Sequence, residues 1–260
     1  MNSNRDEDSV VSIDLSGKTA LVTGGVRGIG KAISLTLAKA GANIVVTYLS
    51  SEALAVEMVK EIIEDFSVNC RAIQMNVRDA RQIRAEMSSL FRESQLDILV
   101  NNAGINEPAD FDKVELASFM RILETNLMGP WIVTQEALQY MRNGGSIIFI
   151  GSLSAELGGP RSVHYAASKH GLEAITRGVA RFVADRNIRS NLVVPGYIRS
   201  PMAESGSISP AVRQLLDQIP LGKRMGEAQE VANVVAFLAS DLASYITGAT
   251  VHVNGGLYFG

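Results

Sequence analysis

The sequence predicts an α/β fold in which a doubly wound parallel sheet of about seven strands is flanked by helices. From residue 18 onward, short apolar runs rich in β-branched residues alternate with longer segments whose apolar residues recur every three or four positions. Several short runs are apolar along their whole length, which indicates strands covered by helices on both faces. The predicted strands are residues 19–23, 42–48, 70–75, 96–100, 145–150, 189–194 and 249–253.

Between the strands lie the predicted helices, which extend over residues 28–40, 52–66, 81–92, 115–141, 163–183 and 227–239. Since no linker-like or low-complexity stretch divides the chain, residues 13–260 are expected to form a single domain. The polar and acidic residues 1–12 are interpreted as a flexible tail. Residues 196–228 lack a strong periodicity and follow the carboxyl end of a predicted strand, where ligands bind in this fold class, so they are interpreted as a substrate lid.

Composition excludes several classes of function. The chain is 47% hydrophobic and 20% charged with a formal net charge of -3, so it has no basic field for nucleic acid. Cys70 is the single cysteine, and His164, His170 and His252 are not at metal-ligand spacings, so neither a disulfide nor a metal site is expected. We find no signal-like start and no run of membrane-spanning length, which predicts a cytoplasmic protein without membrane association.

A glycine-rich turn, "TGGVRGIG" at residues 23–30, directly follows the first predicted strand and opens the first predicted helix. Gly24, Gly28 and Gly30 let this turn be tight and let backbone N–H groups approach a pyrophosphate, to which the helix N-terminus adds partial positive charge. Ordinary strand-to-helix turns can also carry three glycines. The repeating α/β context nevertheless favours a Rossmann-type dinucleotide site.

The end of the second predicted strand, "TYLSS" at residues 47–51, has no acidic residue to hold the 2′-hydroxyl of NAD. The first acid, Glu52, already lies in the next predicted helix. Arg27, together with the hydroxyls of Ser50 and Ser51, could instead pair with a 2′-phosphate. We therefore predict NADP(H) as the cofactor. The alternative interpretation of Arg27 is a solvated surface charge.

The stretch "SVHYAASKHGLEA" places Tyr165 four positions before Lys169, so both side chains share one face of a predicted helix. An ammonium group beside a phenol favours the phenolate and would bring its pKa from about 10 towards a value useful for acid/base work. The spacing alone is a weak signal, because such a pair can arise by chance.

Reduction of a carbonyl needs hydride on carbon and a proton on oxygen, so a proton donor and a second hydrogen-bond donor should converge beside the nicotinamide. Ser152 follows the predicted strand 145–150 in the turn "GSLSA", with Ser154 as its competitor. Asn126 lies in an otherwise apolar predicted helix, where asparagine is an indifferent helix former. Its amide either serves the site, bonds to backbone or bends the helix locally.

Together these residues resemble the short-chain dehydrogenase/reductase family. "TGGVRGIG" matches its cofactor turn, "NNAG" (101–104) the turn after its fourth strand and "PG" (195–196) the turn after its sixth, in the family's order from Leu15 onward. The resemblance implies a catalytic tetrad in which Tyr165 donates the proton, Ser152 holds the substrate oxygen, Lys169 holds the nicotinamide ribose and lowers the tyrosine pKa, and Asn126 positions a water. It also implies cofactor contacts from Thr23, Gly24, Val26, Arg27, Gly28, Ile29, Gly30, Ser50, Ser51, Asn76, Val77, Asn102, Ala103, Gly104, Tyr165, Lys169, Pro195, Gly196 and Ile198.

Within the family the sequence is most similar to the 3-oxoacyl-[acyl-carrier-protein] reductases, which are NADPH-dependent and usually tetrameric. The similarity rests on the closing segment from residue 219 and on "QMNVRD", which contains Asn76. It implies a homotetramer that reduces a 3-oxoacyl thioester, with acyl carrier protein as the partner that delivers it. Two segments depart from the pattern: the acidic "INEPADFDKVE" (105–115) and the helix after Asn126, which lacks the usual basic residue and leaves Arg181 as a basic contact.

Two other functions stay open at this point. Many members of the family share these motifs and oxidise a sugar, a polyol or another secondary alcohol with NAD(P). A non-catalytic dinucleotide-binding protein is the third hypothesis, against which the intact set of Asn126, Ser152, Tyr165 and Lys169 weighs. The fold alone does not decide between them.

Overall fold

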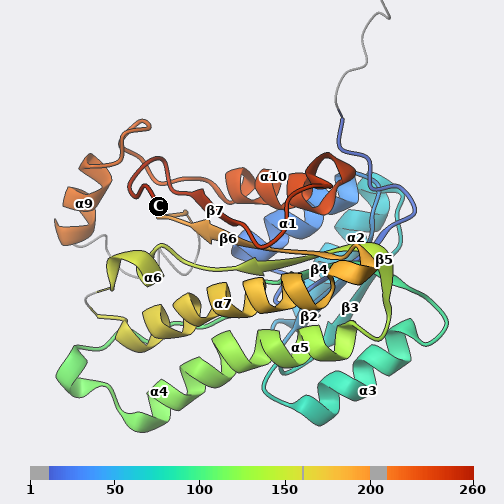
Figure 1. Cartoon of the computed structure of the whole chain (residues 1–260), viewed down its shortest axis with the longest axis horizontal. Coiled ribbons are helices and arrows are strands. Elements are labelled where there is room, and N and C mark those ends of the chain that lie inside the picture. Colours follow the sequence, from blue (N-terminus) through green and yellow to red (C-terminus); the bar gives the residue numbers. More distant parts are fainter. Residues whose placement is uncertain (1–11, 160, 200–209) are drawn as a thin grey trace, which may run out of the picture.

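The computed structural model describes residues 12–159, 161–199 and 210–260, and it contains one sheet of seven parallel strands in the order β3-β2-β1-β4-β5-β6-β7 (Figure 1). This confirms the predicted doubly wound α/β fold of the Rossmann type. All seven predicted strands are present, and most of their ends shift by only one or two residues. The strands are β1 (Thr19–Val22), β2 (Asn43–Tyr48), β3 (Cys70–Gln74), β4 (Leu96–Asn101), β5 (Met141–Ile150), β6 (Arg189–Pro195) and β7 (Thr250–Val253).

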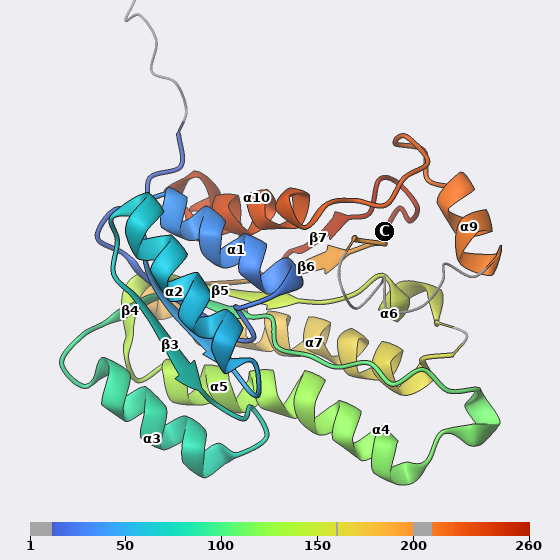
Figure 2. The same ribbon diagram turned by 180° about the vertical axis from the view of Figure 1, so that it is seen from behind.

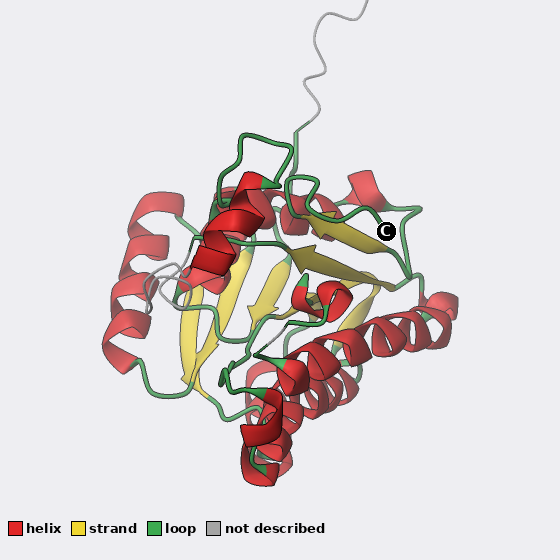
Figure 3. Ribbon diagram, turned by 90° about the vertical axis from the view of Figure 1, so that its left-hand side faces the viewer, coloured by secondary structure: helices red, strands yellow, loops and turns green. Residues whose placement is uncertain are grey.

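Helices cover both faces of the sheet (Figure 2). One face carries α1 (Gly28–Lys39), α2 (Glu52–Phe66) and α10 (Ala228–Ala239). The other carries α3 (Ala80–Phe91), α4 (Leu116–Leu123), α5 (Gly129–Ala137) and α7 (Val163–Phe182). Figure 3 shows the sheet between these layers. Since both faces are covered, every residue of β4 and β6 is buried, as the uninterrupted apolar runs predicted.

The order of the strands reverses beside β1, which pairs with β2 on one side and β4 on the other. Val22 is the register partner of Val46 in β2 and of Val100 in β4. The chain leaves β1 and β4 towards opposite helical layers, so their carboxyl ends border a crevice. Ligands of open α/β sheets bind at such a switch point.

The helix predicted over residues 115–141 is present from Leu116 to Ala137, but it is not one regular α-helix and it ends earlier than predicted. The structure has α4, a π-helical turn η2 (Glu124–Met128) and α5, and Met141 already pairs with Leu96 as the first residue of β5. The guanidinium of Arg186 donates hydrogen bonds to the backbone carbonyls of Leu138 and Met141. These bonds satisfy carbonyl groups just beyond the end of α5 and stabilise the turn into the strand.

The segment interpreted as a lid is only partly described, because residues 200–209 lie outside the described residues, as do residues 1–11 of the predicted tail. Its described part contains the helix α9 (Pro210–Asp217), which the sequence reading missed, and a short helix α6 (Ser154–Leu157) follows β5. Ile198 and Gly226 form a parallel bridge that joins the two ends of the segment. Within the described residues, none of the helices combines the length and the apolar character that crossing a bilayer requires.

Candidate active site

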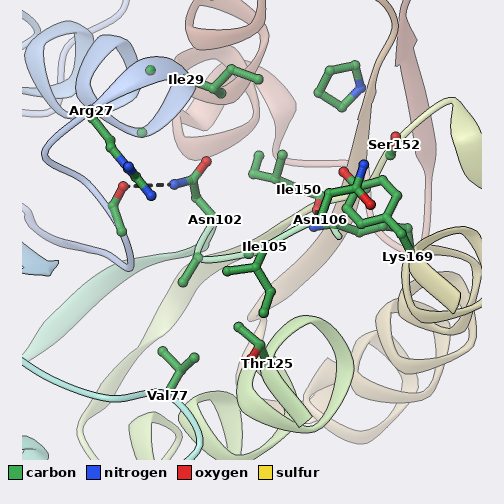
Figure 4. Close-up of a pocket in the computed structure, with 18 of the residues that line it drawn as sticks. Arg27, Ile29, Val77, Asn102, Ile105, Asn106, Thr125, Ile150, Ser152 and Lys169 are labelled. Carbon is green, nitrogen blue, oxygen red and sulfur yellow. Dashed lines mark hydrogen bonds between the residues drawn. The ribbon is translucent and has the colours of Figure 1, made fainter. Parts of the chain in front are cut away.

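A cleft with a volume of about 1140 Å³ opens at the carboxyl edge of the sheet. All but two of the predicted site residues line it. The exceptions, Thr23 and Asn126, are almost completely buried behind its wall. Figure 4 shows Arg27 and Asn102 on one side of the cleft and Ser152, Asn106 and Lys169 on the other. The cleft therefore has a glycine-turn end and a Ser152 end.

The glycine-rich turn forms a tight cradle in which a side chain on Gly30 would collide with neighbouring atoms. Gly24 and Gly28 have φ angles of +62° and +53°, which only glycine adopts readily. A Cβ on Gly30 would lie 2.5 Å from Nδ2 of Asn102. That amide nitrogen donates hydrogen bonds to the carbonyls of Thr23 and Gly24 at 3.0 and 3.1 Å. The turn thus fits the close approach of a pyrophosphate, as predicted.

Thr23 joins this turn to the one that follows β4. Its hydroxyl oxygen accepts hydrogen bonds from the backbone N–H groups of Asn102 and Ala103, both at 3.0 Å. Asn102 and Ala103 are 79 and 80 residues beyond Thr23 in sequence. The buried hydroxyl therefore fixes the position of the glycine-rich turn relative to the turn after β4. Thr23 therefore acts on the cleft through the neighbouring turn and does not line it.

The glycine-turn end of the cleft is positively charged. Arg27 lines it together with Ser50 and Ser51, as predicted, and none of the described residues that line the cleft is acidic. Arg78, which the sequence did not single out, also lines the cleft, and its Nη1 lies 3.7 Å from Oε2 of Glu124. Its position two residues after Asn76 is the signal that could have identified it. These charges favour an anionic ligand.

Tyr165 and Lys169 lie on one face of α7, as the spacing predicted. Nζ of Lys169 is 5.9 Å from the centroid of the Tyr165 ring and donates a hydrogen bond to the carbonyl of Ile150 at 2.7 Å. The Ser152 hydroxyl accepts a hydrogen bond from the backbone N–H of Ser154 at 3.2 Å. Both serines line the cleft, and of the two it is Ser152 that affects the pKa of Tyr165.

The pKa values at this end are governed by burial. Burial lowers the pKa of Lys169 from 10.5 to about 8. It also raises the pKa of Tyr165 above 10.0, and the hydrogen bond with Ser152 only partly opposes this. The expectation that Lys169 brings the tyrosine pKa below its ordinary value is therefore wrong for this structure, because desolvation of the phenolate dominates. A raised pKa keeps Tyr165 protonated at neutral pH, which is what a proton donor requires.

Asn126 lies in the π-helical turn and holds the loop that follows β4. Its Oδ1 accepts a hydrogen bond from the N–H of Ile105 at 2.9 Å, and its Nδ2 donates to the carbonyl of the same residue at 2.8 Å. Nδ2 also donates to Oγ of Ser168, which in turn donates to the carbonyl of Tyr165 at 2.7 Å. The amide therefore bonds to backbone, one of the three possibilities left open, and its role in positioning a water stays a prediction.

Residues that the sequence reading did not single out complete the Ser152 end. Asn106 and Arg121 line it, together with Tyr197 from the segment after β6. The carboxylate of Glu107 accepts hydrogen bonds from Nε of Arg121 at 2.7 Å and from the Ser118 hydroxyl at 2.6 Å. These bonds lower the pKa of Glu107 to about 2, so the pair is charged. The only sequence signal was the polar "INEP" directly after "NNAG".

The cleft has a phosphate cradle at the switch point and, at its other end, a cluster of Tyr165, Lys169 and Ser152. This combination defines a dinucleotide-dependent oxidoreductase. Comparison with known proteins agrees. A family model described as Enoyl-(Acyl carrier protein) reductase matches residues 24–258. The chain belongs to the short-chain dehydrogenase/reductase family and binds a nicotinamide dinucleotide, as the sequence motifs predicted.

Individual relatives cover nearly the whole chain. The 3-oxoacyl-[acyl-carrier-protein] reductase FabG of Aquifex aeolicus is 39% identical over 95% of this chain and 100% of its own length. The enzyme with the same description from Staphylococcus aureus is 41% identical over 93% of this chain and 98% of its own length. A solved structure, a blue fluorescent protein from a metagenomic library in complex with NADPH, has a TM-score of 0.88 and 38% identity, covering 95% of this chain and 100% of that protein.

Proposed function

We propose that this protein is an NADPH-dependent ketone reductase whose natural substrates are 3-oxoacyl thioesters. The observation that carries the proposal is the convergence of Ser152, Tyr165 and Lys169 at one end of a cleft whose other end is a phosphate cradle. The names of the relatives from A. aeolicus and S. aureus support the substrate class.

In the proposed reaction the cofactor supplies a hydride to the carbonyl carbon. The Tyr165 hydroxyl donates its proton to the carbonyl oxygen, so that the ketone becomes a secondary alcohol. Ser152 donates a hydrogen bond to the same oxygen and stabilises the negative charge that develops there. Lys169, held by the carbonyl of Ile150, places a buried positive charge beside the phenol. This charge favours the phenolate that proton transfer forms, although desolvation outweighs it in the pKa of Tyr165 before the reaction.

The choice of NADPH over NADH is part of the proposal. It is supported by the absence of a carboxylate among the described residues lining the cleft and by Arg27, Ser50 and Ser51 at its glycine-turn end. The solved relative that holds NADPH is consistent with it. A 2′-phosphate would meet a guanidinium group there, whereas NADH would leave that group without a partner.

The proposal extends to the partners and to the setting of the enzyme. We infer a cytoplasmic homotetramer that takes its substrate from acyl carrier protein, with residues 196–228 as the lid. Exposed apolar side chains on α4 and α5, among them Leu116 and Trp131, support self-association, and Leu215 of α9 lines the cleft. Sedimentation of the wild type and of Trp131→Glu tests the tetramer, which this variant should weaken. If the wild type and the variant had the same mass, and that mass were below the mass of a tetramer, the proposed tetramer would be wrong.

Consumption of NADPH with acetoacetyl thioester tests the reaction, and crotonyl thioester serves as a control that offers a C=C bond for reduction. We expect turnover of the acetoacetyl compound alone and a loss of at least about 100-fold in Tyr165→Phe, the usual scale of general acid catalysis. NADPH should still bind to the variant. The proposal fails if Tyr165→Phe keeps most of the activity, if crotonyl thioester is the better substrate, or if only polyols react in the reverse direction.

A further inference from the structure

One residue of the loop after β4 lines the cleft and has an amide with an unpaired atom. Asn106 lines the cleft at the same end as Ser152 and Lys169 (Figure 4). Among the described residues, its Oδ1 has no hydrogen-bond partner although the atom is shielded from solvent. Its Nδ2 reaches only Oγ of Ser162, at a long 3.4 Å. A shielded polar atom without a partner is costly, so a ligand that satisfies the amide gains by binding there.

Both residues next to Asn106 are anchored, Ile105 through its backbone and Glu107 through its side chain. Asn126 holds the N–H and the carbonyl of Ile105 at 2.9 and 2.8 Å. On the other side, Ser118 and Arg121 hold the carboxylate of Glu107 at 2.6 and 2.7 Å. The residue between two such anchors cannot move away from the cleft at low cost. Its amide is therefore preorganised for a ligand.

Nearby asparagines do not share this property. Asn102 uses its amide nitrogen within the glycine cradle, and Asn126 uses both ends of its amide on the loop. Oδ1 of Asn101 also has no partner in the described part of the chain, but Asn101 is almost completely buried and does not line the cleft. Of these residues, Asn106 combines an unpaired amide atom with a place in the lining of the cleft.

We propose that Asn106 is a specificity-determining residue that binds the second carbonyl of the substrate, an inference that rests on the proposed function. A 3-oxoacyl thioester carries this carbonyl one methylene away from the ketone that is reduced. A rotation of the side chain that brings its N–H groups to the cleft would let Oδ1 accept from the Ser162 hydroxyl, which can donate as well as accept. Both ends of the amide are then paired, and the thioester oxygen receives a hydrogen bond.

A simple ketone has no group for this amide, and the difference can be measured. We compare kcat/KM for acetoacetyl thioester with kcat/KM for an aliphatic ketone in the wild type, Asn106→Leu and Asn106→Asp. Both variants lack the N–H donor, so the ratio of the two values should fall about ten-fold, the worth of one hydrogen bond. Asn233→Leu, the same change on an exposed face of α10, is the matched control. A fluorescence titration with NADPH shows whether the cofactor end is intact.

The outcomes separate the inference from the function on which it rests. A fall in the ratio in both Asn106 variants, with NADPH binding retained, supports the inference. Equal losses on both substrates would mean that Asn106 only shapes the loop, and unchanged ratios would mean that it touches no substrate carbonyl; either result overturns the inference alone. If the wild type reduces the aliphatic ketone but not the thioester, the proposed function fails and the inference fails with it.

Discussion

Replacing Lys169 with methionine should stabilise the protein near pH 7 while it removes the proposed catalytic charge. The ammonium group is buried, with only 5% of the residue exposed, and burial lowers its pKa from 10.5 to about 8. At about 1.4 kcal/mol per pH unit, this interval corresponds to roughly 3 kcal/mol of unfavourable desolvation. Methionine has a similar length and no charge, so the variant does not carry this desolvation cost.

One favourable interaction is lost in the exchange. Nζ donates to the carbonyl of Ile150 at 2.7 Å, and leaving this carbonyl unpaired costs about 1–2 kcal/mol. The net gain in the free energy of unfolding near pH 7 is therefore about 1–2 kcal/mol. Activity with acetoacetyl thioester should fall at the same time, because residues that serve catalysis often lower the stability of the fold.

The pH dependence gives the sharper test. Below pH 8 the lysine is protonated in both the native and the unfolded protein, so the native state carries the full desolvation cost. Between pH 8 and 10.5 the unfolded protein binds more protons than the native one, so the stability of the wild type rises through this window. Methionine does not titrate, and the advantage of the variant should shrink accordingly.

Urea denaturation of both proteins near pH 7 and near pH 9.5 measures this change. The difference in free energy of unfolding between variant and wild type should move by about 2 kcal/mol in favour of the wild type at the higher pH. All other titrating groups are common to both proteins and cancel in the difference. A difference that stays constant within about 0.5 kcal/mol would refute the argument that Lys169 is a desolvated cation.

Three further changes have defined outcomes. Arg27→Ala should weaken NADPH binding about ten-fold in a fluorescence titration, since it removes one charge-assisted contact, and should affect NADH less than two-fold. Equal weakening of both would exclude a 2′-phosphate contact. Gly30→Ala should weaken both cofactors at least about ten-fold, because its Cβ would lie 2.5 Å from Nδ2 of Asn102; wild-type affinity would contradict the cradle. Asn126→Leu leaves the N–H and the carbonyl of Ile105 unpaired and should lower the free energy of unfolding by about 2–4 kcal/mol in urea, whereas a loss below about 1 kcal/mol would mean that the loop relaxes.

Features that follow from local pattern or from the topology of a parallel sheet could be predicted from the sequence. The carboxyl ends of β1, β2, β4, β5 and β6 meet at one edge, so the residues that follow these strands were expected to lie together, and they line one cleft. Tyr165 and Lys169 share a face of α7 because residues four apart on a helix always do.

Features decided by distant residues could not be predicted. The apolar period of residues 115–141 continues past Ala137, and it is Arg186, 48 residues beyond Leu138, that binds the carbonyls where the chain turns into β5. The role of Asn106 depends on anchors from Asn126 and Arg121, neither of which is its neighbour in sequence. The pKa of Tyr165 is a balance between burial and Ser152 that the spacing to Lys169 does not reveal.

The π-helical turn lets Asn126 hold the loop after β4 without turning either of the helices that flank it. Five residues of a π-helix sweep about the same angle as four of an α-helix, so Glu124–Met128 hold one extra residue while α4 and α5 keep their faces. Deleting one residue of this turn would restore a regular α-helix and leave the buried face of α5, with Val133, against the sheet. The side chains within the turn would be re-aimed, so such a deletion should release the loop held by Asn126 and spare the fold.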